Sequence, residues 1–182
     1  MNRRELFRFG GMAAAAAGVA LAMRPTEAEA ATNFLWEGAG TYGVSVANLL
    51  TTQLNALASS TGNVLSTLGG ATQNTTGRIY ADVEFVAGGT FSPTVGGFIE
   101  LWFLRSLDGG STYEDGSATV APPRPPDITI PVTAGTSITP RNGSPGLIMP
   151  PAFYKPLARN QTGATLPASG NLIRFALYTE QF

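Results

Sequence analysis

Apolar and polar residues alternate over much of the chain beyond position 79, with the period of two that a half-buried β-strand requires. The clearest segment is 79–86, in which apolar side chains share one face. Asp82 and Glu84 lie on the other face, where charge keeps the sheet soluble and discourages pairing between sheet edges. This segment is therefore predicted to be a strand with one buried side and one solvent-facing side.

A second strand pattern, over 98–104, is apolar on both faces apart from Glu100. Such a run is typical of a central strand that is covered on both sides. Because a carboxylate inside that strand needs a partner, we expect Glu100 to pair with Arg105 or with Arg174.

Four further segments have strand-like patterns, and turn sequences separate them. The segments are 127–132, 146–149, 152–159 and 172–179. The turns are rich in Gly, Asn, Asp and Pro, as in Asn142-Gly143. The proline-rich stretch 121–126 is expected to be an extended crossing loop. About seven short strands with such punctuation predict an all-β fold, an antiparallel β-sandwich or jelly roll.

The segment 46–57 differs, because its apolar residues recur every three or four positions. They are Val46, Leu49, Leu50, Leu54 and Leu57. Ser45 is placed to cap an N-terminus, and Gly62 follows the end, so one short amphipathic helix is predicted before the strands. A strand over 41–46 is an alternative for the residues just before it. Residues 31–182 are thus expected to form a single β-sandwich domain.

Composition favours an uncharged polar surface. Of 182 residues, 43% are hydrophobic and 13% are charged, against a usual charged share of about a quarter. The formal net charge is −1 and no run of Lys or Arg occurs, so binding to nucleic acid is not expected. The sequence contains no Cys and no His, which excludes disulfides, thiolate ligands and the commonest general base. No catalytic residue is predicted, and we expect the protein not to be an enzyme.

Carboxylate pairs and the single lysine are the residues from which catalysis would have to be built. A glycosidase places two acids on either side of one bond. Asp82 and Glu84, however, are neighbours on one strand face, and they most simply keep the sheet soluble. Glu114 and Asp115 are neighbours in a turn. Lys155 has no serine motif beside it that would support a serine–lysine mechanism.

The loop 108–115 contains the best candidates for a cation site. Its acidic residues are Asp108, Glu114 and Asp115. Together with Asp127 they offer oxygen ligands of the kind that Ca²⁺ takes, although the spacing is not that of an EF-hand. The alternative is a solvated turn in which Asp108 caps its own backbone. No other cofactor is expected.

Aromatic residues suggest a platform for stacking against a sugar ring. Tyr113, in a loop beside acids, is the best candidate for an exposed ligand contact. Trp102 is expected to pack in the core instead. The other aromatic residues weighed for this role are Trp36, Tyr42, Tyr154 and Tyr178.

Residues 1–30 have the three parts of an export signal: a basic start, a short apolar stretch and an A-x-A end. Arg3 and Arg4 open it, and Ala28 and Ala30 close it. The twin arginines and the weakly hydrophobic, Ala-rich centre resemble a twin-arginine (Tat) signal peptide. The apolar stretch is shorter than the ~20 residues of a membrane span, so no permanent anchor is expected. The alternatives are an N-terminal arm that is never exported, or a wrongly assigned start codon.

Three stretches resemble small β-sandwich proteins encoded among the virion genes of tailed bacteriophages. They read LWFLRSLDGGSTYEDG at 101–116, RPPD at 124–127 and MPPAFYKPLARNQTG at 149–163. The stretch LLTTQLNAL at 49–57 is similar to the N-terminal portion of these proteins. The resemblance spans most of 49–182 and implies a virion structural protein, such as a capsid decoration or a head- or tail-associated part.

This resemblance implies self-association, docking on other virion proteins and a location in the virion. Phage particles assemble in the cytoplasm, so the export-like N-terminus conflicts with that interpretation. The alternative function is a Tat-exported binding module, with glycan as a candidate ligand, in the periplasm or outside the cell. The greater number of matching residues favours the virion.

Overall fold

The computed structural model describes residues 33–36, 46–60, 62–74 and 79–181. The chain divides into two compact units, one of them formed by Met1–Asn33 with Glu180–Phe182. The other, Phe34–Thr179, contains most of the described residues and the hydrophobic core. Within the described ranges the secondary structure consists of β-strands and one 3-10 turn, Thr52–Leu54. The predicted all-β class is confirmed.

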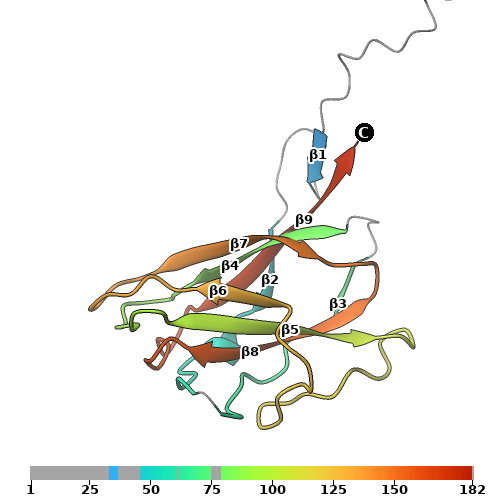
Figure 1. The fold of residues 1–182 in the computed structure, drawn as a ribbon. Coiled ribbons are helices and arrows are strands. Elements are labelled where there is room, and N and C mark those ends of the chain that lie inside the picture. Colours follow the sequence, from blue (N-terminus) through green and yellow to red (C-terminus); the bar gives the residue numbers. More distant parts are fainter. Residues whose placement is uncertain (1–32, 37–45, 61, 75–78, 182) are drawn as a thin grey trace, which may run out of the picture. The chain divides into compact units, whose positions relative to one another are not determined.

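The described residues form nine strands in two sheets (Figure 1). The strands are β1 (Asn33–Trp36), β2 (Val46–Leu50), β3 (Thr72–Gln73), β4 (Tyr80–Val86), β5 (Phe98–Ser106), β6 (Ile128–Pro131), β7 (Arg141–Ile148), β8 (Phe153–Gln161) and β9 (Leu172–Gln181). One sheet has the order β1-β9-β4-β7, with β2 also paired to β9. The other has the order β3-β8-β5-β6. The pairings of β2 through β9 are antiparallel.

Strands β2 to β9 pair like the two arms of one long hairpin. The first strand pairs with the last, the second with the second last, and so on to the middle pair. These pairs are β2 with β9, β3 with β8, β4 with β7, and β5 with β6. Successive pairs alternate between the two sheets. The hairpin is therefore wound around the core, and its bend is the long connection between β5 and β6.

One hydrophobic core lies between the sheets. Phe85 of β4 and Ile173 of β9 enter it from one side, and Leu101 of β5 and Ile130 of β6 from the other, all with no exposed surface. Strand β4 alternates between buried and half-buried residues along its whole length, as its sequence pattern predicts. The two sheets thus form a sandwich-like arrangement whose inner faces exclude water.

A second cluster covers the outer face of the β3-β8-β5-β6 sheet. Trp102 and Leu104 of β5 pack there with Leu157 of β8 and with Leu65, which precedes β3. Strand β5 is consequently buried on both faces, and the prediction for 98–104 is confirmed. The crossing loop, from the proline-rich stretch, lies against this cluster through Ala121.

The helix predicted over 46–57 is wrong. Val46 to Leu50 form β2, whose backbone pairs with β9 in a ladder. A register shift between Asn48 and Leu50 turns both Leu49 and Leu50 inward, so a bulged strand produces apolar spacing like that of a helix. Residues 41–45, which include the expected cap Ser45, lie outside the described residues.

Strand β7 is longer than predicted, because Asn142 and Gly143 lie within it opposite Phe85 and Glu84. They were expected to form a turn. Glu100 pairs neither with Arg105 nor with Arg174. Its partner is Arg159 of β8, directly opposite in the ladder, with 2.5 Å between Arg159 Nε and Glu100 Oε2.

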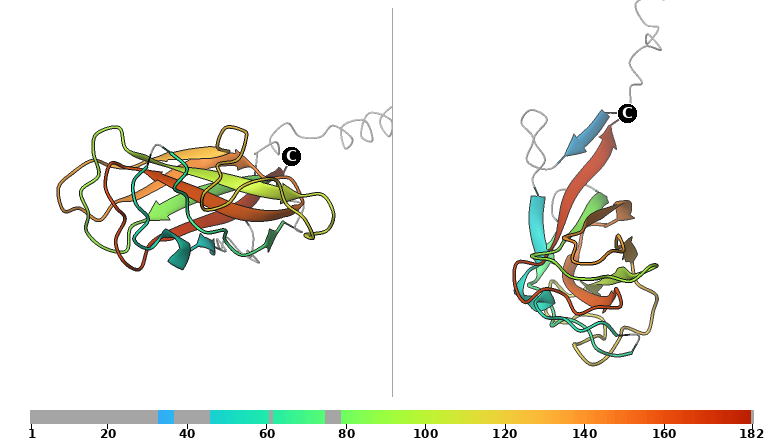
Figure 2. Two further views of the ribbon diagram at one scale, coloured as in Figure 1. Left: turned by 90° about the horizontal axis from the view of Figure 1, so that it is seen from below. Right: turned by 90° about the vertical axis from the view of Figure 1, so that its left-hand side faces the viewer.

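Three connections meet at one end of this unit: β4–β5, β6–β7 and β8–β9 (Figure 2). The backbone nitrogen of Thr94 donates to the carbonyl of Thr162 at 2.8 Å, which joins the first connection to the third. Gly88 lies against the β8–β9 connection so closely that an added Cβ would be 2.0 Å from the Ser169 carbonyl oxygen. The loops at this end are therefore fixed by backbone contacts.

Candidate functional site

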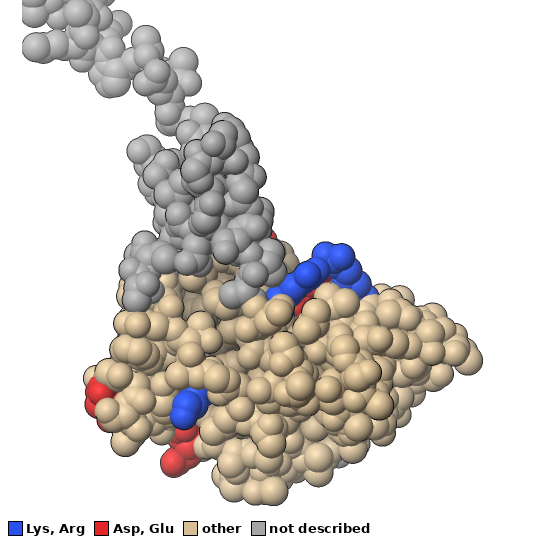
Figure 3. All heavy atoms as spheres, turned by 180° about the vertical axis from the view of Figure 1, so that it is seen from behind, with Lys and Arg blue, Asp and Glu red and all other residues tan. Residues whose placement is uncertain are grey.

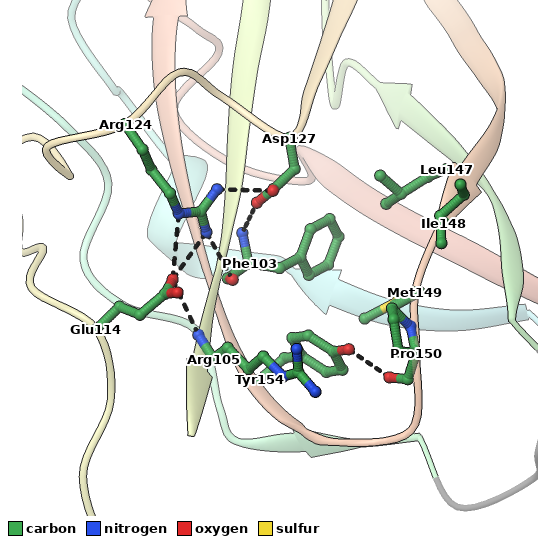
Figure 4. Close-up of a pocket in the computed structure, with 10 residues that line it drawn as sticks. All are labelled: Phe103, Arg105, Glu114, Arg124, Asp127, Leu147, Ile148, Met149, Pro150 and Tyr154. Carbon is green, nitrogen blue, oxygen red and sulfur yellow. Dashed lines mark hydrogen bonds and ion pairs between the residues drawn. The ribbon is translucent and has the colours of Figure 1, made fainter. Parts of the chain in front are cut away.

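A pocket of about 310 Å³ opens beside β5, at the edge where the two sheets face each other (Figure 4). It exists because β6 is short. Strand β6 pairs only with Phe98 to Leu101, whereas β5 continues to Ser106. Beyond Leu101 the outer edge of β5 has no neighbouring strand among the described residues, and side chains occupy part of that space.

Three side-chain bonds and one backbone bond from the β5–β6 connection satisfy the polar groups on the free edge of β5. The Phe103 N–H donates to Asp127 Oδ2 at 2.6 Å, and the Phe103 carbonyl accepts from Arg124 Nη2 at 2.9 Å. The Arg105 N–H donates to Glu114 Oε2 at 3.3 Å, and the Arg105 carbonyl accepts from the Glu114 N–H at 3.1 Å. Four backbone groups that an adjacent strand would bind are therefore already bonded, as buried or edge polar groups require.

Arg124 holds this network together. Its Nη1 lies 2.6 Å from Asp127 Oδ1, and its Nη2 lies 2.9 Å from Glu114 Oε2. Burial lowers the pKa of the Arg124 guanidinium, but the hydrogen bonds to Asp127 and Glu114 outweigh burial and raise it above its ordinary value. The Trp102 indole N–H also donates to the Arg124 carbonyl at 3.1 Å, which anchors the proline-rich loop. We call Arg124, Asp127 and Glu114 the edge cluster.

The opposite wall of the pocket is apolar. It comes from the end of β7 and the β7–β8 connection, with Leu147 and Met149 facing the Phe103 ring (Figure 4). Tyr154 packs edge-on against Phe103, with ring centroids 6.2 Å apart, and its hydroxyl donates to the Pro150 carbonyl. Burial raises the pKa of Tyr154, so this hydroxyl keeps its proton at neutral pH.

Arg105 lines the same pocket but stands apart from the edge cluster. Its side chain is exposed, and within the described part of the chain its guanidinium makes no ion pair or hydrogen bond. Burial raises the pKa of the Tyr154 hydroxyl, and the positive charge of Arg105 lowers it by a smaller amount. The pocket therefore has an apolar wall and two arginines. Arg124 is paired with carboxylates, and the Arg105 guanidinium has no ion-pair or hydrogen-bond partner among the described residues.

Of the three acids of the predicted cation site, Asp108 and Glu114 have separate partners. The Asp108 carboxylate accepts bonds from the Ser106 hydroxyl at 2.6 Å and from Thr112, which hold the pKa of Asp108 far below its usual range. Glu114 belongs to the edge cluster, and Asp115 is exposed. No group of three acidic residues suited to a metal ion occurs among the residues described. The expected self-capping turn at Asp108 is present, and the Ca²⁺ site stays a prediction.

Tyr113 is half-buried and packs against the second cluster, that of Trp102 and Leu104, on the outer face of the β3-β8-β5-β6 sheet. The ammonium of Lys155 lies 4.4 Å from its ring centroid. Its hydroxyl is buried and has no hydrogen-bond partner among the described residues. Trp102 is buried, as expected, with Arg159 over its ring. A ligand contact by Tyr113 stays a prediction.

The outer face of the β4 sheet carries a second charged group. Glu84 bridges Arg141 of β7 and Arg174 of β9, and Arg174 Nε lies 2.6 Å from Glu84 Oε2. Asp82 accepts from the Gly146 N–H at 3.0 Å, beside a bulge in β7. These acids pair with neighbouring strands. Charged side chains are sparse on the face drawn in Figure 3.

Several predicted features lie outside the described residues. They are the export signal with Arg3, Arg4, Ala28 and Ala30, and the aromatic Tyr42. Among the described residues, no helix has the length and apolarity needed to cross a membrane.

The edge cluster was not recognised from the sequence. Its members are separated by up to 13 positions, so their proximity depends on the path of the β5–β6 connection. One signal was available: Arg124 and Asp127 are three residues apart in a proline-rich stretch of otherwise uncharged residues. Comparison with protein-family models, curated proteins and solved structures finds no match to this chain.

Proposed function

We propose that this chain is a non-enzymatic structural protein of a bacteriophage or prophage virion, a capsid decoration or a head- or tail-associated part. It acts by self-association and by docking on a lattice of other virion proteins. The observation that carries the proposal is the order of the strands in the two sheets.

The strand order supports a jelly-roll-like fold. Numbered from β2, the two sheets run 1-8-3-6 and 2-7-4-5, which is the order that a wound hairpin of eight strands produces. Double-sheet jelly rolls of eight strands occur in viral capsid proteins, and also in lectins and cupins. Fold alone does not assign a function, so the proposal also rests on the surface and on the sequence resemblance.

The surface supports assembly, because large apolar side chains project from it. Val95 in the β4–β5 connection is 93% exposed, and Leu107 after β5 is 87% exposed. Ile148 at the end of β7 is 66% exposed. Exposed apolar side chains stabilise an assembly when a partner covers them and removes them from water.

The proposal is also supported by a sequence resemblance, since 101–116, 124–127 and 149–163 resemble stretches of phage virion proteins. These stretches contain most of β5, the edge cluster and all of β8. The non-enzymatic part of the proposal rests on the lack of His and Cys in the sequence.

Incorporation into particles tests the proposal. The wild-type chain and the single variants Val95→Asp and Leu107→Asp are produced with a tag in the phage-producing host, and particles are purified. We expect at least one of the two variants to be depleted from particles, because a charge replaces an exposed apolar contact. Thr119→Asp, at an exposed polar position, is the matched control and should be incorporated normally. Absence of folded wild-type protein from the particles overturns the proposal.

The alternative is a Tat-exported binding module, favoured by the sequence Arg3-Arg4 and by the A-x-A end at Ala28 and Ala30. It predicts a mature chain that begins at Ala31. A Lys substitution of both Arg3 and Arg4 would then block export. Under the virion proposal the same double substitution leaves particle incorporation unchanged.

A further inference from the structure

The pocket beside β5 combines features that select a ligand, independently of the assembly role. Its edge-cluster side is fixed, because Arg124 is bonded to two carboxylates and to the Phe103 carbonyl. Its opposite side is apolar and aromatic, with Met149 buried and Tyr154 edge-on to Phe103. The volume of about 310 Å³ is at the lower end of the range of small-molecule sites.

Strand addition by a peptide is excluded as the mode of binding. An incoming strand would need the backbone groups of Phe103 and Arg105, and both residues already have their N–H and carbonyl bonded to the β5–β6 connection. A ligand must therefore bind through side chains and through the apolar wall.

Charge selects the polar part of the ligand. Among the described residues that line the pocket, four are charged: Arg124, Glu114, Asp127 and Arg105. The first three bond to one another, which leaves Arg105 as the lining cation without a partner among the described residues. Since the four charges sum to zero, a ligand with one negative charge fits better than a polyanion. A guanidinium binds a carboxylate with paired, charge-assisted hydrogen bonds.

The position of Arg105 in the pocket indicates what the apolar part of the ligand must be. Figure 4 shows Arg105 beside the Tyr154 ring, with Phe103 and Met149 lining the space between the two walls. A carboxylate held by Arg105 would therefore direct an attached group toward aromatic and sulfur-containing side chains. Such walls favour an aromatic ring or a branched apolar group.

We propose that this pocket binds a small monocarboxylate that carries an aromatic or branched apolar group. The carboxylate pairs with Arg105, and the apolar group packs against Phe103, Met149 and Tyr154. The proposal does not depend on the virion role, so its failure would leave that role unaffected.

Titration of the full chain with N-acetyl-L-phenylalanine, followed by NMR shifts of the backbone amides, tests the proposal. We expect saturable shifts centred on Phe103, Arg105 and Tyr154. Two related probes separate the parts of the ligand. N-acetyl-L-phenylalanine amide lacks the charge, N-acetylglycine lacks the ring, and each should bind at least about tenfold more weakly.

Arg105→Gln is the matching variant, because it keeps polarity at an exposed position and removes the charge. We expect its affinity for N-acetyl-L-phenylalanine to fall about tenfold. Arg141→Gln is the control, since that arginine is also exposed and pairs with Glu84 on another face; its affinity should equal that of the wild type. Equal binding by Arg105→Gln and wild type, equal binding of the amide probe, or no saturable binding of N-acetyl-L-phenylalanine would overturn the proposal.

Discussion

The Asp127 carboxylate accepts a hydrogen bond from the Phe103 backbone N–H at 2.6 Å, at the point where β6 has ended and β5 continues. A side chain thus replaces the main chain of a missing strand segment. The Arg124 guanidinium completes this substitution by donating to the Phe103 carbonyl. The edge of β5 is closed without a strand, and the space that remains beside it is the pocket.

Replacement of Arg124 by Ala should destabilise the unit strongly. It removes the guanidinium from two carboxylates, which keep only their backbone N–H donors, and from the Phe103 carbonyl; we expect a loss of about 2–3 kcal/mol in the free energy of unfolding. Arg141→Ala is the control, because its side chain is 64% exposed and solvent screens its pair with Glu84, so this variant should lose much less stability. Urea unfolding measures both. Equal losses in the two variants would contradict a special role for the edge cluster.

The pair of Glu100 with Arg159 gives a second prediction. The two side chains are only 11% and 16% exposed, and Gln161 Nε2 also donates to Glu100 at 2.7 Å. Glu100→Ala leaves the arginine charge buried and unpaired, at a cost of about 3–5 kcal/mol. Glu100→Gln retains one acceptor oxygen and should lose less stability. Chemical unfolding of the two variants tests this order, and a greater loss in Glu100→Gln than in Glu100→Ala would refute it.

Gly88 should tolerate no side chain. An added Cβ would lie 2.0 Å from the Ser169 carbonyl oxygen and 2.3 Å from the Gly170 carbonyl carbon. The β8–β9 connection would have to move, and we expect Gly88→Ala to destabilise by more than about 2 kcal/mol.

Gly70→Ala is the matched control for that variant. Nothing lies within 4 Å of its Cβ position, and alanine at such a site is expected to be neutral or stabilising by up to about 1 kcal/mol. Thermal unfolding measures the stability of both variants, and we expect only Gly88→Ala to be less stable than the wild type. A stable Gly88→Ala protein would mean that the loops at this end are not fixed by close backbone contact.

Stability should depend on pH through Glu84. Burial raises the pKa of its carboxyl, but the hydrogen bonds and charges of Arg141 and Arg174 outweigh burial and hold it below its ordinary value of 4.5. A carboxylate with a lowered pKa stabilises the fold above its unfolded value, and this contribution is lost as pH falls through the folded value. Wild type should therefore be more stable than Glu84→Gln at about pH 7, with the difference shrinking below about pH 5. A difference that stays constant with pH would contradict the linkage.

The sequence predicted those strands whose patterns depend only on burial. Strand β4 alternates because one face meets the core. Strand β5 is apolar on both faces over most of its length, because loops cover its outer face. The segment 46–57 misled because a bulge brings Leu49 and Leu50 to the same side, and no local signal distinguishes that from a helical stripe. Its conformation depends on pairing with β9, which is more than a hundred residues away in sequence.

The candidate site was harder to predict, because its contacts are set by the β5–β6 connection. The sequence grouped Asp108, Glu114, Asp115 and Asp127 as one candidate site. The structure brings only Glu114 and Asp127 together, around the Arg124 guanidinium. The partner of Glu100 was missed for a similar reason. Arg159 is opposite Glu100 only in the register of β5 with β8, and strand register follows from packing.

The most direct test of the virion proposal is mass spectrometry of the native protein from its own host, comparing purified phage particles with a periplasmic extract. The proposal predicts peptides of 31–182 in the particles at a stoichiometry that matches a repeated structural part. Recovery of the chain only from the periplasm, with its N-terminus at Ala31, would contradict it.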